Sequence, residues 1–221
     1  MSQKQVSEIF KKVYSWMFLG LLLSGIAAYL TLSTPLKFLI LGNMWIFFGL
    51  IILELIFVVA ISGIIKKLPA KTAKTLFFFY SFLNGLTLSL IFLVYTSSSI
   101  VLVFFITASM FGIMALYGFF TKHDLSKLGP IMFMALIGLI ISLVVNMFIR
   151  SSQFDFIISI LGVIIFSALI MYDNQKIKKI ALLVKNKSQL ERYSIIATLG
   201  LYLDFVNLFL FLLRIFGKRK R

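Results

Sequence analysis

The sequence predicts an all-α membrane protein with seven transmembrane helices. Of its 221 residues, 61% are hydrophobic, and the mean hydropathy is +1.07. Soluble domains contain only about 45–50% apolar residues, because their surface must face water. The apolar residues also gather in stretches near the roughly 20 residues that a helix needs to cross a bilayer. The seven stretches are residues 13–32, 44–65, 76–95, 100–120, 131–149, 156–172 and 195–216.

The connections between these stretches are short and rich in turn residues. Pro35, Pro69 and Pro130 each lie in or beside one, where proline and its polar neighbours favour a break in the chain. Seven spans leave no room for a separate globular domain. We therefore expect one transmembrane domain over residues 1–221, with a short N-terminal tail (1–12) and a basic C-terminal tail (217–221). The first span is too long for the apolar region of a typical signal peptide, so we expect it to be retained.

The composition argues against several kinds of site. There are no cysteines, which excludes disulfides, thiolate metal sites and thiol nucleophiles. The one histidine, His123, makes a zinc site unexpected, since zinc usually takes several Cys or His ligands. We expect no cofactor. The net charge of +15 lies in loops between apolar stretches, where it indicates membrane orientation and not nucleic-acid binding.

The basic residues predict a cytoplasmic N-terminus. The N-terminal tail and every second connection together carry fifteen Lys and Arg residues, whereas the intervening connections carry only Lys37 and Arg150. Positive loops face the cytoplasm. One feature conflicts with this rule, because seven crossings would leave the basic residues of the tail on the outside. Either the last segment is re-entrant or the six loops outweigh the tail, and we favour a full seventh crossing.

Three of the seven acidic residues lie within the apolar stretches: Glu54, Asp173 and Asp204. A charged side chain in hydrocarbon costs several kcal/mol, so an acid there marks a functional candidate. Asp204 is the most informative of them, and Asn207, three residues later, lies on the same helix face. One interpretation is a neutral carboxyl that packs through a hydrogen bond to a neighbouring helix. The other is an ion- or proton-handling residue.

Asp173 lies where the sixth stretch meets a basic loop, so it is either an interfacial carboxylate or a partner of Asp204. Consecutive antiparallel helices would bring the two together toward the cytoplasmic side. Two carboxyls in contact do not both ionise easily, so the pair would titrate in two separated steps. Such a pair could act as a pH-dependent latch. It would also offer Ca²⁺ a weak site, because calcium prefers more oxygen ligands than two carboxyls supply.

The other deep charges are Glu54 and Arg214. Glu54 would cost least beside a cation or an amide, and Arg214 is one candidate partner. Alternatively, Arg214 extends to the membrane interface, because it lies near the end of its span. Asn84 is expected to form an interhelical hydrogen bond.

Three segments resemble the Bax inhibitor-1 family of membrane proteins, in its bacterial branch. They are residues 118–129 (GFFTKHDLSKLG), 171–175 (MYDNQ) and 201–217 (LYLDFVNLFLFLLRIFG). The first is similar to the family's loop after the fourth span, the second to its Tyr-Asp-x-Gln signature and the third to its final helix. The resemblance covers essentially the whole chain.

The resemblance implies six helices around a central seventh, in a bacterial inner membrane. It also implies a pH-sensitive calcium leak in which Asp173 and Asp204 hold the cytoplasmic side, with an acid in the second helix that Glu54 matches. Bacterial members often place an arginine near the end of that helix, whereas this chain has Lys66 and Lys67. Lysine lacks the bidentate fork of arginine, so a latch through Lys66 would be weaker.

Two classes of function remain open. The first is a passive cation leak gated by protonation of the aspartate pair, with calcium or protons as the permeant or bound species. The second is an interaction protein that modulates a membrane partner, such as a membrane-bound protease. We expect no enzyme, because the sequence shows neither a Ser-His pair nor a zinc motif. An intramembrane aspartic-protease pair is the weakest alternative, since neither aspartate has glycine-rich surroundings.

Overall fold

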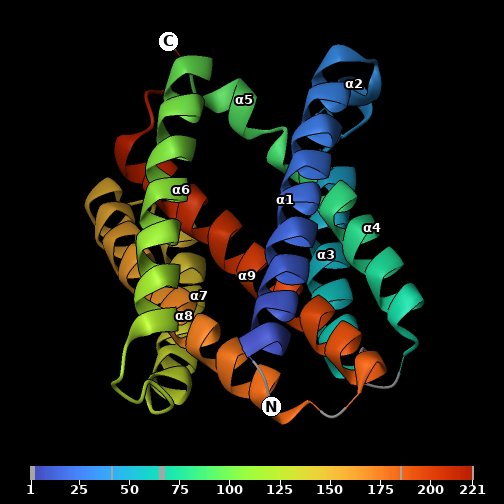
Figure 1. Ribbon diagram of the computed structural model, residues 1–221. Coiled ribbons are helices and arrows are strands. Elements are labelled where there is room, and N and C mark those ends of the chain that lie inside the picture. The colour runs from blue at the N-terminus through green and yellow to red at the C-terminus, as the bar shows by residue number, and fades with distance from the viewer. Residues whose placement is uncertain (1–2, 41, 65–67, 185, 221) are drawn as a thin grey trace. The chain divides into compact units, whose positions relative to one another are not determined.

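The computed structural model describes residues 3–40, 42–64, 68–184 and 186–220 of the chain, and these are almost entirely helical (Figure 1). Within those ranges there is no β-strand, which confirms the predicted fold class. The helices are α1 (Gln3–Ser33), α2 (Leu36–Ile40), α3 (Met44–Ile64), α4 (Ala70–Leu88), α5 (Ile91–Val94), α6 (Ser97–Phe120), α7 (Leu128–Ile149), α8 (Ser152–Leu183) and α9 (Lys187–Phe216).

Six segments of the described chain are long and apolar enough to cross a membrane: α1, α4 together with α5, α6, α7, α8 and α9. The seventh predicted span is α3, whose 21 residues correspond to a helix about 30 Å long, as thick as the hydrocarbon core. In α9, 67% of the apolar window is buried, against 39% or less in the other five. The central position that the resemblance implies for the last helix stays a prediction.

Three helices extend well beyond the apolar stretches that predicted them. The helix α1 begins at Gln3, α8 continues to Leu183, and α9 begins at Lys187. The added turns carry most of the basic residues of the N-terminal tail and of the sixth connection. Hydropathy alone ended these helices too early, because a helix that leaves the bilayer keeps its backbone hydrogen bonds in water.

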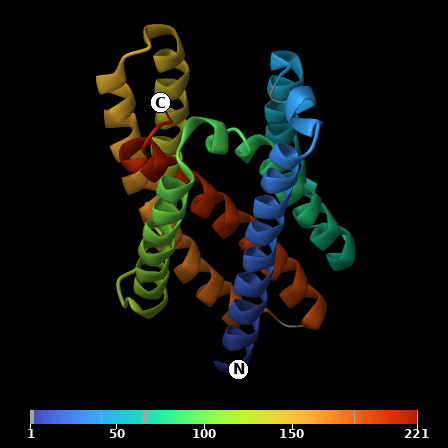
Figure 2. The same cartoon turned by 90° about the horizontal axis from the view of Figure 1, so that it is seen from above.

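The chain divides into two compact units. Unit 1 comprises residues 1–94 and 180–202, and unit 2 comprises residues 95–179 and 203–221. In unit 1, α4 packs against both α1 and α3, and the three helices lie side by side in both views (Figures 1 and 2). In unit 2, α7 and the first part of α8 run side by side (Figure 2).

Small residues allow the close contact between α1 and α4. A Cβ added at Gly85 of α4 would overlap the backbone of Ser24 and come within 2.7 Å of the Ala27 side chain. A Cβ at Gly20 of α1 would lie 2.6 Å from the ring of Phe77. In lipid, helix association depends on such close packing, because the hydrocarbon supplies no hydrophobic drive. The contact brings the polar side chain of Ser24 against α4.

The end of the chain is fixed to one end of α6. The backbone nitrogen of Thr96 donates to the carbonyl oxygen of Lys218 at 2.9 Å, and the nitrogen of Lys218 donates to Ser99 Oγ at 2.8 Å. The opposite end of α6 leads into the loop that contains His123. The C-terminal tail and this loop therefore lie at opposite ends of unit 2. This arrangement agrees with a full seventh crossing, the alternative that we favoured from the sequence.

Single introduced cysteines test this topology directly, because the chain has none of its own. We expect Lys220→Cys and Ser126→Cys to react with a membrane-impermeant maleimide from opposite sides of the membrane. With the predicted orientation, Lys220→Cys reacts in intact cells and Ser126→Cys only after the membrane is opened. Reaction of both from the same side would show that the last helix does not cross.

Candidate functional site

The two aspartates predicted as a pair lie close together in unit 2. Asp173 is on α8 and is half-buried, and Asp204 is on α9 with 7% of its surface exposed. Their carboxyl groups are near enough to interact electrostatically. The residues that follow Asp204, Phe205 and Val206, are both buried and apolar. The pair therefore consists of one buried acid and one that is half-buried.

One oxygen of Asp204 is buried without a hydrogen-bond partner. Atom Oδ2 has no donor within reach among the described residues. Asn207 shares the helix face, as predicted, but its amide nitrogen donates to the carbonyl oxygen of Leu203 at 2.8 Å. A buried carboxyl oxygen without a donor costs free energy, and buried groups of this kind are rare in folded proteins. This favours a proton- or ion-handling role over a packing contact.

Two glycines allow α6 and α7 to pack closely against the segment of α8 that carries Asp173. A Cβ at Gly118 of α6 would overlap the carbonyl group of Met171, and a Cβ at Gly129 of α7 would overlap the ring of Tyr172. Thus α6 and α7 both approach α8 at the two residues that precede Asp173. Neither glycine was predicted as a site residue. The sequence signal that could have identified them is their position at the two ends of the 118–129 motif.

Gln175 fastens the loop between α6 and α7 to α8. Its Nε2 donates to the carbonyl oxygen of His123 at 2.7 Å, and its Oε1 accepts from the backbone nitrogen of Leu125 at 2.9 Å. Lys178 adds a bond to the carbonyl oxygen of Phe119 at 2.8 Å. These contacts join the loop motif to the Tyr-Asp-x-Gln motif. The sequence showed both motifs but not that Gln175 joins them.

Asp124 is the acidic partner in this loop, outside the membrane-spanning segments. A hydrogen bond from Lys179 at 2.5 Å, together with bonds from Ser126, lowers the pKa of Asp124 from 3.8 to about 2. Because this pKa is lower in the folded chain, the ion pair stabilises the fold above about pH 4 and is lost as the pH falls through about 2. Asp124 therefore stays ionised throughout the neutral range.

We therefore expect Asp124→Asn to leave any pH response between about pH 5 and about pH 8 unchanged, since the group does not titrate there. The measurement is ion flux or thermal stability of the variant across that range. A shift of the response relative to the unmodified chain would mean that the Asp124–Lys179 pair takes part in pH sensing.

Glu54 lies in unit 1 and is 9% exposed. Its Oε2 accepts from Asn84 Nδ2 at 3.1 Å, and its Oε1 accepts from Thr87 Oγ1 at 2.8 Å. The expected amide partner is therefore present, and Asn84 is an interhelical hydrogen bonder, as predicted. Arg214, the other partner considered for Glu54, belongs to unit 2, and its pairing with Glu54 stays a prediction. Arg214 Nη1 lies 3.3 Å from Asp155 Oδ1 in unit 2, because both side chains lie near the end of α9 and the start of α8.

Two further expectations concern Lys66 and a metal site. Lys66, and Lys67 beside it, lie outside the described residues, so the latch that they would replace stays a prediction. Among the described residues, no three His, Asp or Glu side chains gather as a metal-binding group. A calcium ion at Asp173 and Asp204 would therefore have only two carboxylates, which agrees with weak and transient binding.

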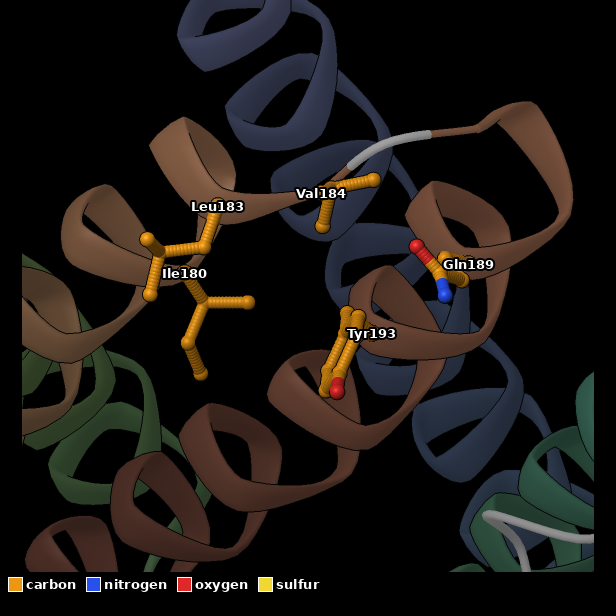
Figure 3. Close-up of a pocket in the computed structure, with 5 residues that line it drawn as sticks. All are labelled: Ile180, Leu183, Val184, Gln189 and Tyr193. Atoms are coloured by element: carbon orange, nitrogen blue, oxygen red, sulfur yellow. The ribbon is translucent and has the colours of Figure 1, made fainter.

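A separate hollow of about 280 Å³ lies in unit 1, where α8 ends and α9 begins (Figure 3). Ile180, Leu183 and Val184 of the α8 end face Gln189 and Tyr193 of α9 across it. Its lining contains no ionisable carboxyl, so it supplies none of the chemistry of the aspartate pair.

Comparison with known proteins agrees with the motifs. Residues 6–221 match the family described as "Inhibitor of apoptosis-promoting Bax1". The chain is 46% identical over 212 residues to the inner membrane protein YbhL of Escherichia coli K12, covering 95% of this chain and 91% of YbhL. It is also 46% identical to a Borreliella burgdorferi protein over 211 residues, covering 95% and 91%. A Rickettsia prowazekii protein, RP147, is 42% identical over 212 residues, covering 95% and 89%.

Proposed function

Because the chain belongs to the Bax inhibitor-1 family of membrane proteins, we propose that it is a pH-sensitive passive calcium leak. Its place would be the bacterial inner membrane, with the N-terminus in the cytoplasm. The gate is the pair formed by Asp173 and Asp204. Protonation of this pair changes its charge and thereby the passage of cations.

The observation that carries the proposal is the buried Oδ2 of Asp204, which has no hydrogen-bond partner among the described residues. A purely structural role would leave the cost of this unpartnered oxygen uncompensated in the fold. A proton or a passing cation would supply what the oxygen lacks. Intramembrane acids of this kind mark ion and proton pathways.

The second carboxyl makes the site responsive to pH. Asp173 interacts electrostatically with Asp204, so the charge of each affects the proton affinity of the other. With both ionised, the two carboxylates repel each other and attract a divalent cation. With one proton shared, the pair carries a single negative charge, so the repulsion is removed and the attraction for the cation is weaker. The state of the pair therefore changes both the α8–α9 contact and the affinity for calcium.

Calcium entry into dye-loaded liposomes that contain the purified full chain tests this proposal. Flux is measured from about pH 5 to about pH 8, a range that includes neutral pH, beside protein-free liposomes. We expect flux above the protein-free level that changes with pH. If inserted, folded protein gives no flux, the leak is wrong, and a membrane interaction protein that acts on a partner such as a membrane-bound protease becomes the better candidate.

A further inference from the structure

A chain of polar side chains crosses the interior of unit 1. It begins at Glu54 on α3, continues through Asn84 on α4 and Tyr202 on α9, and reaches Ser24 on α1. The final contact joins Ser24 Oγ to the carbonyl oxygen of Ser81 on α4. All five residues are less than 10% exposed. Buried polar networks of this kind are costly wherever a contact is left unmade.

The contacts all have the length of hydrogen bonds. Asn84 Nδ2 lies 3.1 Å from Glu54 Oε2, and Tyr202 OH lies 2.9 Å from Asn84 Oδ1. Ser24 Oγ lies 2.7 Å from Tyr202 OH and also 2.7 Å from the Ser81 carbonyl oxygen. Each contact can therefore be a hydrogen bond if a proton is available for it.

The available protons are too few when Glu54 is ionised. Asn84 then turns its NH₂ group toward Glu54, and Tyr202 donates its hydroxyl proton to the Asn84 oxygen. Ser24 has one proton left for Tyr202 and the Ser81 carbonyl, and the Gly20 carbonyl oxygen of its own helix also lies 3.0 Å from its Oγ. One of the two 2.7 Å contacts must then remain unmade. The ionised state thus leaves the network one proton short.

One added proton on Glu54 satisfies every contact along the chain from Glu54 to the Ser81 carbonyl. Glu54 donates to the Asn84 oxygen, and the Asn84 amide, turned over, donates to Tyr202. Tyr202 then donates to Ser24, and Ser24 donates to the Ser81 carbonyl. The two amide orientations occupy nearly the same space, so the heavy atoms keep their positions. The three contacts from Glu54 to Ser24 reverse direction, while Ser24 donates to the Ser81 carbonyl.

We propose that Glu54 is a proton-binding site of unit 1, separate from the aspartate pair, and that the chain Asn84–Tyr202–Ser24 responds to its charge by reversing its hydrogen bonds. Tyr80 on α4 and Tyr202 on α9 are the titratable groups that face Glu54 in the described part of the unit. When Glu54 is protonated, Ser24 on α1 is hydrogen-bonded to both α4 and α9. When Glu54 is ionised, Ser24 is bonded to only one of these two helices.

Infrared difference spectroscopy on the full chain in lipid bilayers tests this inference. A step from higher to lower pH should produce a carbonyl band of a protonated carboxylic acid. We expect part of this band to disappear in Glu54→Gln and to persist in Asp173→Asn and Asp204→Asn. If Glu54→Gln keeps every carboxylic band of the unmodified chain, Glu54 takes up no proton and the inference is wrong.

The reversal of hydrogen bonds along Asn84–Tyr202–Ser24, here called the relay, is tested by Ser24→Ala and Tyr202→Phe. Each removes the contact between Ser24 and Tyr202, so protonation of Glu54 no longer gains a hydrogen bond there. We therefore expect the Glu54 band at the lower pH to be weaker in both variants. Ser194→Ala is the matched control, because Ser194 on α9 is equally buried and donates to Leu190 in its own helix. Bands of equal strength in all three would overturn the relay. The test needs no ion flux, so it is independent of the calcium assay.

Discussion

Asp204→Asn is expected to remove most of the pH dependence of calcium entry while leaving the protein inserted and folded. The substitution keeps the shape of the side chain but removes the group that binds the proton. Asp173 then loses its partner and titrates alone near the surface. The measurement is the change in calcium flux between about pH 5 and about pH 8 in liposomes, relative to the unmodified chain.

Asp124→Asn is the matched control, since it makes the same replacement in the same unit at a carboxylate outside the membrane. Its flux should follow pH as in the unmodified chain. If Asp204→Asn also keeps the full response, the buried carboxyl is not the pH-sensitive group, and its role is that of a packing contact.

Gly85→Leu is expected to lower the free energy of unfolding by about 1–3 kcal/mol or to prevent folding, because it overpacks a tight interface. Any Cβ at this position would overlap the backbone of Ser24 on α1. The separation of the α1 and α4 backbones would also pull Ser24 away from the Ser81 carbonyl. The measurement is the fraction of protein that remains monodisperse in detergent after heating to increasing temperatures.

Gly138→Leu provides the comparison, because nothing lies within 4 Å of a Cβ at that position on α7. Leucine also has a higher helix propensity than glycine, so this variant should be as stable as the unmodified chain or more so. Equal loss of stability in both variants would show that glycine is needed at Gly85 for a reason other than the close contact.

The apolar stretches could be predicted because the bilayer imposes a length and a composition on every span. The ends of α1, α8 and α9 could not, because in water the helix boundary no longer depends on hydropathy. Pro130 illustrates the difference. The sequence places it in or beside a turn, yet it lies in the first turn of α7, where the nitrogen of a helix has no intrahelical acceptor and proline is tolerated.

The aspartates could be predicted because a charge in an apolar stretch is conspicuous. Their partners were harder to find. Arg214 was considered for Glu54 on charge alone, whereas its contact is Asp155, a residue that the sequence showed only as part of a loop. Tyr202 and Ser24 were missed altogether. Hydroxyl groups are common in membrane helices, and only the fold shows which of them meet a carboxyl.

A double-mutant cycle on the pH response tests the central claim, that Asp173 and Asp204 act together as one proton-sharing gate. The pH-induced change in calcium flux is measured for the unmodified chain, Asp173→Asn, Asp204→Asn and the double variant. If the pair titrates as one unit, the double variant should respond no less than Asp204→Asn alone, because the first substitution already disables the gate. If each single substitution lowers the pH response and the two losses add in the double variant, the two aspartates do not form a shared gate.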